Sequence, residues 1–152
     1  MAKSKYANKG LAARFALVLF ACALLLTAAL MLAGVRLKPI DVSSCKKPLD
    51  TLSFGVDKFE NEGTVLVSGW AFDSARNYDS FCTVAVIKDT ATGKYYEIPT
   101  ATRTAESDGD DELPTGFFAR GLSLFNRVGE GELFLIYSDG LNRYLIDTDL
   151  TA

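Results

Sequence analysis

The sequence predicts an all-β domain, an antiparallel sandwich of two sheets, preceded by one N-terminal transmembrane helix. Three observations predict it. There is one long uncharged run near the N-terminus, a series of short segments rich in β-branched and aromatic residues after residue 50, and no sustained 3.6-residue period past residue 40. These observations divide the chain into four parts, which are residues 1–14, 15–35, 36–51 and 52–149.

Residues 1–14 form a basic tail, and residues 15–35 form the predicted membrane helix. The tail has no acidic residue and carries Lys3, Lys5, Lys9 and Arg14. The run from Phe15 to Val35 has 21 residues without a charge. A helix rises about 1.5 Å per residue, so this run matches a hydrocarbon core of roughly 30 Å. Membrane lipid is therefore the expected partner of residues 15–35.

The orientation of this helix depends on the charges that flank it. Basic residues stand on both sides, because Arg36, Lys38, Lys46 and Lys47 follow the run closely. The positive-inside count is therefore nearly even. A short tail without acids stays in the cytosol easily, and an acidic β-rich domain is typical of exported proteins. We expect a single-pass signal-anchor in the cell membrane, with the N-terminus cytoplasmic and the C-terminal domain extracytoplasmic.

A cleaved signal peptide is the alternative interpretation of the apolar run. Residues 15–26 would be its h-region, and Thr27-Ala28-Ala29 would be a cleavage site of small residues. Apolar sequence continues past that site to Val35, which is longer than an h-region requires. A lipoprotein anchor at Cys22 fits less well, because Phe20 is too large for such a motif. We favour an uncleaved anchor.

Residues 36–51 predict a juxtamembrane linker, since they hold two prolines and several small polar residues. From Leu52 onward, segments rich in Val, Ile, Phe, Tyr and Thr alternate with turn residues. The seven predicted strands are 52–59, 64–72, 81–89, 94–98, 115–124, 132–137 and 143–148. Seven short strands in about a hundred residues fit an antiparallel, immunoglobulin-like sandwich better than a closed barrel or an α/β fold.

Two of these strands have a predicted place in their sheet. Residues 81–87 are apolar on both faces, so we expect this strand to be central. Residues 94–98 alternate more, so we expect that strand near an edge.

Trp70, in the segment "VSGWAFD", is the only tryptophan in the chain. By a period of two, Leu66, Ser68 and Phe72 share its face, and that face is mostly apolar. We therefore expect Trp70 to pack between the sheets, with an exposed platform for sugar stacking as the alternative. Gly69 indicates a bulge or a close approach of two backbones.

The composition argues against catalysis and against nucleic-acid binding. The chain has no histidine, so the commonest general base and zinc ligand is missing, and so is the usual middle member of a catalytic triad. Residues 37–152 carry 11 Lys and Arg against 19 Asp and Glu, a net charge of −8. An acidic domain lacks the basic patch that supplies most affinity for nucleic acid. We expect neither an enzyme nor a nucleic-acid partner.

Aromatic side chains beside polar ones predict a carbohydrate site. Tyr95 and Tyr96 are adjacent, so one of them faces away from the core if the segment is a strand. Sugars stack on such rings through their C–H faces, and neighbouring polar groups bond the hydroxyls. A solvent-facing Tyr can also serve only to stabilise cross-strand pairs. The candidate ligand-binding residues are Trp70, Arg76, Asn77, Tyr78, Asp79, Tyr95 and Tyr96.

The loop "AESDGDDELP" is a candidate calcium site. It places Glu106, Asp108, Asp110 and Glu112 at alternate positions, and calcium takes about six to eight oxygen ligands. EF-hand spacing fails, because Gly109 stands at the wrong position. An ordinary solvated loop is the simpler interpretation. We expect no cofactor, with Ca²⁺ as the alternative.

The positions of the three cysteines allow one disulfide in the domain. Cys22 lies in the apolar run, so Cys45 and Cys82 are the only candidates for a disulfide in the domain. In an oxidising compartment a bridge would tie the linker to the third predicted strand. Otherwise Cys82 is a small, buried core residue of that strand and Cys45 is a free thiol.

Several segments together resemble a known kind of domain. They are "VSGWAFD", Asp79-Ser80 with the apolar strand that follows, Lys94-Tyr95-Tyr96, Arg103, "TGFFARG" and "GEGELFLIY". This set resembles the Gly-Trp-Ala-type extracytoplasmic β-sandwich accessory domain of bacterial envelope membrane proteins, such as those of surface polysaccharide and the cell wall. The resemblance covers about residues 52–149. It implies a binding or structural module outside the membrane and carries over no catalytic residue.

We therefore expect a non-catalytic, membrane-anchored module. It would bind envelope polysaccharide or dock on a membrane-embedded polysaccharide or cell-wall enzyme. A structural or protein-interaction module without glycan affinity is the second class of function, and a calcium-dependent adhesive module is the third.

Overall fold

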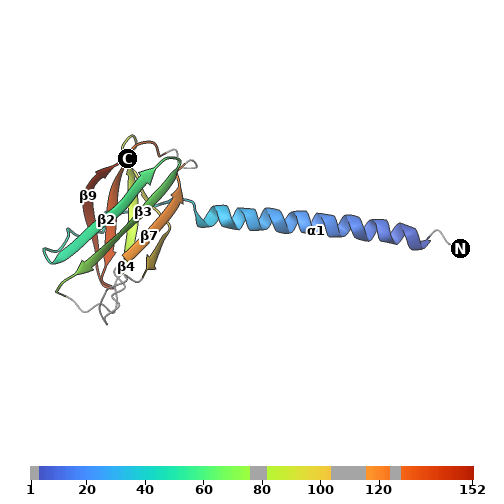
Figure 1. Cartoon of the computed structure of the whole chain (residues 1–152), viewed down its shortest axis with the longest axis horizontal. Helices are drawn as coiled ribbons and strands as arrows, with labels where there is room; N and C mark the ends of the chain where they lie inside the picture. The colour runs from blue at the N-terminus through green and yellow to red at the C-terminus, as the bar shows by residue number, and fades with distance from the viewer. Residues whose placement is uncertain (1–3, 76–81, 104–115, 124–127) are drawn as a thin grey trace. The chain divides into compact units, whose positions relative to one another are not determined.

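The structure is a computed structural model, and it describes residues 4–75, 82–103, 116–123 and 128–152 (Figure 1). The chain divides into two compact units, Met1–Gly34 and Val35–Ala152. The first unit is a helix, and the second is built from β-strands.

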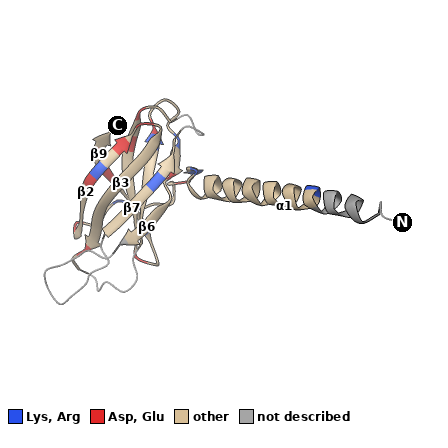
Figure 2. Cartoon of the chain, turned by 45° about the vertical axis from the view of Figure 1, so that its right-hand side comes forward, with Lys and Arg blue, Asp and Glu red and all other residues tan. Residues whose placement is uncertain are grey.

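The first unit contains the helix α1 (Ser4–Gly34). Its segment Ala13–Gly34, 22 residues, is long and apolar enough to cross a membrane, and all side chains of that segment are exposed. Figure 2 shows this part of the ribbon almost free of charged residues. The Thr27 hydroxyl donates a hydrogen bond of 2.8 Å to the carbonyl oxygen of Ala23, so no polar group of this side chain is left without a partner. The predicted N-terminal apolar helix is confirmed, and it also takes in most of the predicted basic tail.

The second unit consists of two antiparallel sheets. The five-stranded sheet has the order β1 (Lys38–Pro39), β5 (Tyr95–Glu97), β4 (Cys82–Asp89), β8 (Gly131–Ser138), β9 (Arg143–Thr151). The four-stranded sheet has the order β2 (Leu52–Asn61), β3 (Thr64–Asp73), β7 (Gly116–Leu122), β6 (Thr100–Arg103). The prediction of a mostly β, two-sheet domain is confirmed.

The described residues form nine strands, so the prediction of seven was wrong. The additional strands are both short: β1 contains Pro39, and β6 follows Pro99. The predicted strand 94–98 is β5, and the chain changes sheets just beyond it. The Ile98 amide donates to the Ala85 carbonyl of β4 at 2.9 Å, whereas the Pro99 carbonyl accepts from Arg120 of β7 at 3.0 Å. A strand that changes sheets within two residues leaves no mark in the period-two pattern.

The two predicted strand positions are confirmed. β4 is the middle strand of its sheet, and its residues Ala85, Val86 and Ile87 are all buried. β5 lies next to the two-residue edge strand β1.

The core lies between the two sheets. Alternate residues of β3 point into it, and they meet inward residues of β4 and β8. The fully buried core residues of these three strands are Val65, Val67, Ala71, Ala85, Ile87, Leu133 and Leu135.

Residues 36–51, which we expected to form a linker, belong to the compact unit Val35–Ala152. Leu37 is 1% exposed and lies in the core. Further along, the Lys46 amide donates to the Arg143 carbonyl at 2.8 Å, and the Leu145 amide donates to the Lys46 carbonyl at 3.0 Å. The prolines and small polar residues predict irregular backbone. The apolar side chains among them still pack against the sandwich, because this removes apolar surface from water.

Part of this segment covers one face of the sandwich. Ile40, Val42 and Cys45 pack over Val86, Phe134 and Ile136, which point outward from the five-stranded sheet. The outer face of that sheet is therefore shielded from solvent at its centre. The outer face of the four-stranded sheet, in contrast, keeps large apolar side chains accessible.

Candidate functional site

Trp70 lies on the outer face of the four-stranded sheet. Along β3 the buried residues are Val65, Val67, Gly69 and Ala71, and Trp70 alternates with them and is partly exposed. The expectation that Trp70 packs between the sheets was therefore wrong. Leu66, Ser68 and Phe72 do share its face, as the period of two predicts. Both alternating sets of β3 are largely apolar, and the set with the smaller side chains is the one that faces inward.

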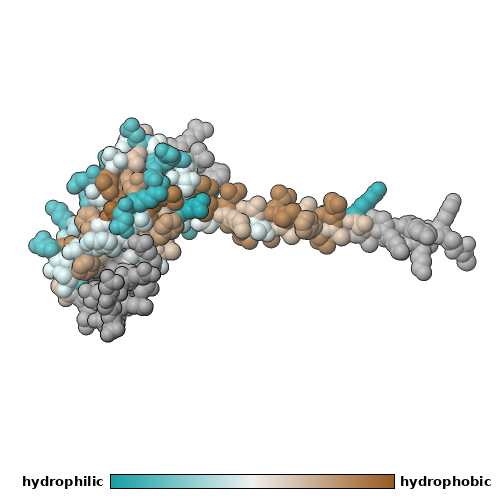
Figure 3. Space-filling model, in the orientation of Figure 1, coloured by the Kyte–Doolittle hydropathy of each residue, from teal (hydrophilic) through white to brown (hydrophobic). Residues whose placement is uncertain are grey.

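The strand register places this outer face in rows across the sheet. Trp70 lies between Gly55 of β2 and Gly116 of β7, and Arg103 of β6 follows Gly116. The next row is Lys58, Ser68, Phe118 and Ala101, and the third is Glu60, Leu66 and Arg120. We call the outward residues Leu66, Ser68, Trp70, Phe72 and Phe118 the aromatic face. Figure 3 shows apolar groups, interrupted by hydrophilic ones, over β2, β3 and β7.

The Trp70 ring lies over Gly55. A Cβ atom added at Gly55 would stand 2.7 to 2.8 Å from three indole atoms, Nε1, Cε2 and Cζ2. Only glycine can occupy this position while the ring stays where it is. On its own strand the ring contacts Phe72, with centroids 5.6 Å apart and planes tilted by 32°. Within the described part of the chain, the indole N–H has no hydrogen-bond acceptor.

Phe118 completes the aromatic face from the neighbouring strand. Its side chain is 45% exposed, whereas the adjacent Phe117 is 1% exposed and lies in the core. The residues between Phe118 and Trp70, Ser68 and Gly116, are small. The rings of Phe118 and Trp70 therefore project from the sheet on either side of these small residues. Sequence reasoning missed Phe118, although two adjacent Phe residues in a strand must point to opposite faces, which was a sufficient signal.

Among the residues that the structure describes, Lys58, Glu60 and Arg120 border the aromatic face. The Lys58 Nζ lies 3.0 Å from the Glu60 Oε1, in a pair that is about half exposed. Arg120 is exposed beside Leu66, and among the described residues its guanidinium has no carboxylate partner. No local sequence pattern selects Arg120, because its place beside the aromatic face depends on the pairing of β3 with β7.

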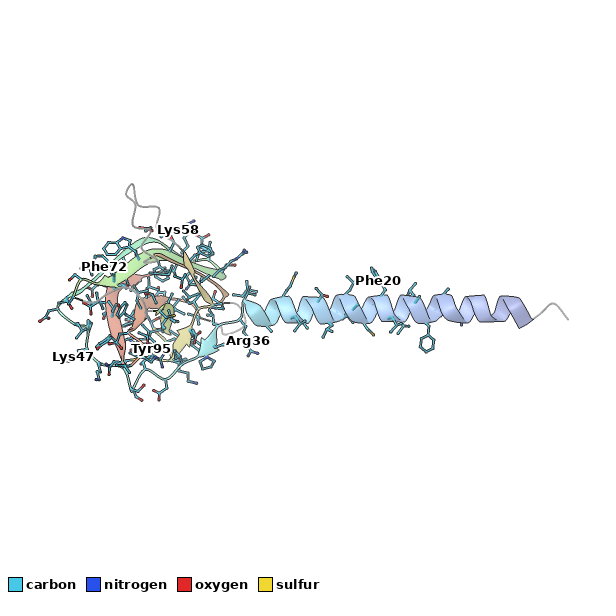
Figure 4. All side chains as sticks on the ribbon, turned by 90° about the horizontal axis from the view of Figure 1, so that it is seen from below. Phe20, Arg36, Lys47, Lys58, Phe72 and Tyr95 are labelled. Carbon is cyan, nitrogen blue, oxygen red and sulfur yellow. The ribbon has the colours of Figure 1, made fainter. Side chains whose placement is uncertain are left out.

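Tyr95 and Tyr96 point to opposite sides of their strand, as the sequence predicts. Tyr96 packs against the core, and Tyr95 lies on the outer side, edge-on to Phe134 with centroids 5.4 Å apart. Tyr95 and Trp70 belong to different sheets, and each lies on the outer face of its own sheet. Figure 4 shows Phe72 and Tyr95 on opposite sides of the sandwich. The structure therefore does not unite Trp70 with Tyr95 in one site.

Tyr95 borders a separate groove. Lys94, Tyr95 and residues 39–43 line an open groove of about 580 Å³. Asp41, at its rim, accepts hydrogen bonds of 2.9 Å from the Ser43 amide and from the Ser43 hydroxyl. These bonds, the backbone one first, hold the pKa of the Asp41 carboxyl below its ordinary value. Asp41 and Ser43 thus stabilise the local turn by hydrogen-bonding to each other.

Several predicted residues lie outside the described residues. They are the candidate ligand residues Arg76, Asn77, Tyr78 and Asp79 and the candidate calcium ligands Glu106, Asp108, Asp110 and Glu112. In the parts of the chain that are described, no three Cys, Asp or Glu side chains converge as a metal site would require.

Cys45 and Cys82 are both free thiols. Cys82 was expected to be buried, but it stands exposed at the first position of β4, on its outer side. Cys45 is half-buried against the five-stranded sheet.

Thiol reactivity should separate these two cysteines. In the fragment 35–152, a disulfide reagent such as Ellman's should modify Cys82 rapidly and Cys45 slowly, because only the exposed thiolate is freely accessible. A C82S variant should retain the slow phase alone. A native fragment that releases no thiol signal until it is reduced would show a Cys45–Cys82 bridge and contradict this expectation.

Comparisons of the chain with protein-family models, with curated proteins and with solved structures find no match. The function is therefore inferred from the geometry of the sandwich and from the chemistry of its exposed residues.

Proposed function

We propose that the chain is a membrane-anchored, non-catalytic module that binds envelope glycan through the aromatic face. The observation that carries this proposal is the partly exposed Trp70 ring, laid over Gly55 with Phe72 and Phe118 beside it. Sugar rings stack their C–H faces on such aromatic surfaces. The indole N–H, which has no acceptor among the described residues, adds a donor for a sugar hydroxyl.

The position of these rings supports a binding role over a purely structural one. A Trp and two Phe residues on one outer face keep apolar area in water, which works against folding stability. Contiguous accessible apolar groups with a polar border mark interaction surfaces in soluble domains. The other sheet of this sandwich buries its outer apolar residues under residues 40–45, so exposure is not general in this fold.

The location of the aromatic face within the sandwich fits an anchored module. The chain joins the sandwich at Val35, whose carbonyl accepts a 2.7 Å hydrogen bond from the Leu122 amide. Leu122 pairs with Thr64, and Trp70 lies six residues further along β3, which is about 20 Å in a strand. Within the sandwich, Trp70 thus lies about 20 Å along the sheet from the row that contains Thr64 and Leu122.

The proposal includes the topology and class of the module. We place the N-terminus in the cytosol and the sandwich outside the cell membrane, because residues 1–14 are basic and the sandwich is acidic. We assign the sandwich to the immunoglobulin-like class on its two antiparallel sheets and its size. The resemblance to envelope accessory domains agrees with this assignment.

The sole tryptophan makes the proposal directly measurable. The fragment 35–152 should fold alone, since the described side chains of α1 contribute nothing to the core. We expect its emission to be quenched by iodide, because Trp70 is partly exposed. Titration with envelope polysaccharide fractions should shift the emission, saturate, and protect Trp70 from iodide. If no polysaccharide protects Trp70 but a membrane protein does, the aromatic face is a protein-docking surface and the glycan proposal fails.

A further inference from the structure

The charges that border the aromatic face contrast with those of the whole domain. Residues 37–152 have a net charge of −8. On the outer face of the four-stranded sheet, Glu60 is engaged by Lys58, and the exposed Arg120 has no carboxylate partner among the described residues. This face therefore offers a cation to a ligand.

The spacing between the rings and Arg120 limits the size of that ligand. Arg120 lies two residues from Phe118 on the same strand, which is about 7 Å. It pairs with Leu66, and Trp70 lies four residues further along β3, about 13 Å away. A single sugar ring cannot touch both Trp70 and Arg120. A chain of several sugar rings can, with Phe118 and the small Ser68 beneath its middle.

We infer that the ligand of the aromatic face is an acidic oligosaccharide or polysaccharide whose carboxylate pairs with Arg120 while its rings stack on Trp70 and Phe118. This inference rests on the proposed function. A guanidinium matches a carboxylate with two parallel hydrogen bonds, which gives geometric specificity as well as attraction. Glu60, on the same outer face, is engaged by Lys58, and charges more than about 8 Å from the ligand are screened at physiological ionic strength.

The test compares each polyuronate with its own uncharged form. Polygalacturonate and alginate are titrated into the fragment 35–152 beside their carboxyl-reduced derivatives, which keep the sugar chain and lose the charge. We expect the acidic polymers to bind about tenfold more tightly at low salt, and this advantage to shrink as salt is added. Oligomers of one or two sugars should bind much more weakly than longer ones.

Matched variants assign the effect to Arg120. R120Q should bind acidic and carboxyl-reduced polymers equally, with the affinity of the wild type for the reduced form. K94Q, which alters an exposed cation on the other sheet, should leave the tenfold advantage intact. Circular dichroism confirms that both variants are folded.

The outcomes separate the two proposals. Equal binding of acidic and reduced polymers to the wild type, with Trp70 protected from iodide, would overturn the acidic ligand and leave glycan binding standing. An acidic advantage that survives R120Q would overturn the role of Arg120. If neither form of any polymer binds or protects Trp70, both the inference and the proposed function fail for polysaccharide.

Discussion

Replacing Gly69 by alanine is expected to destabilise the sandwich by about 3 kcal/mol, because the added methyl group has no space. Gly69 faces inward on β3, opposite Val56 and beside the bulge of β2 between Val56 and Lys58. A Cβ atom there would stand 2.2 Å from the Gly55 carbonyl oxygen and 3.1 Å from the Val56 Cα. Both atoms belong to backbone, so they cannot turn aside as a side-chain end would. For a domain of this size, the loss corresponds to a fall in Tm of about 10 °C.

The matched control for G69A is G129A in the same fragment, 35–152. A Cβ atom at Gly129 meets nothing within 4 Å, and the φ angle of Gly129 does not fall in the left-handed region. We expect its effect on unfolding to stay within about 0.5 kcal/mol. If G69A unfolds at the temperature of the wild type, β2 and β3 do not approach closely enough at Gly69 to exclude a methyl group.

Removing the Trp70 ring is expected to weaken glycan binding by about 30-fold, the loss typical of an aromatic residue at the centre of an interface. W70A deletes the stacking surface and the indole N–H together. Since this variant has no tryptophan, its affinity is measured by calorimetry, after circular dichroism has confirmed the fold. G55A offers a milder perturbation, because its Cβ would displace the indole ring without removing it. We expect G55A to bind more weakly than the wild type and more tightly than W70A.

The control for W70A is Y95A, which removes a partly exposed ring from the other sheet. Tyr95 was a candidate ligand residue in the sequence, and the structure places it away from the aromatic face. We expect Y95A to retain wild-type affinity. If Y95A loses binding and W70A does not, the ligand occupies the groove beside Tyr95 instead.

Gly69 and Trp70 show where sequence reasoning succeeds and where it stops. A glycine before a large aromatic residue in a strand predicts a close backbone approach, and Gly69 makes one. Which way Trp70 faces was not decided by that pattern. The two alternating sets of β3 have the same period, and both are apolar enough to enter a core.

Residues 36–51 show a second limit. Their prolines and polar residues predict irregular backbone, and most of the segment has no regular strand. Its attachment to the sandwich depends on Leu37, Ile40 and Val42 finding apolar surfaces that belong to strands far away in the sequence. No local pattern contains that information.

The sequence by itself determined the elements whose signal is local. A long uncharged run specifies the helix α1, and alternating apolar residues between turn signals specify the strands of an antiparallel sandwich. Tertiary structure alone decided which face of each strand is inside, which sheet residues 40–45 cover, and that Trp70, Phe118 and Arg120 share one surface. The physical reason is that burial depends on the volumes and positions of all packing partners together, and these partners come from strands that are distant in the sequence.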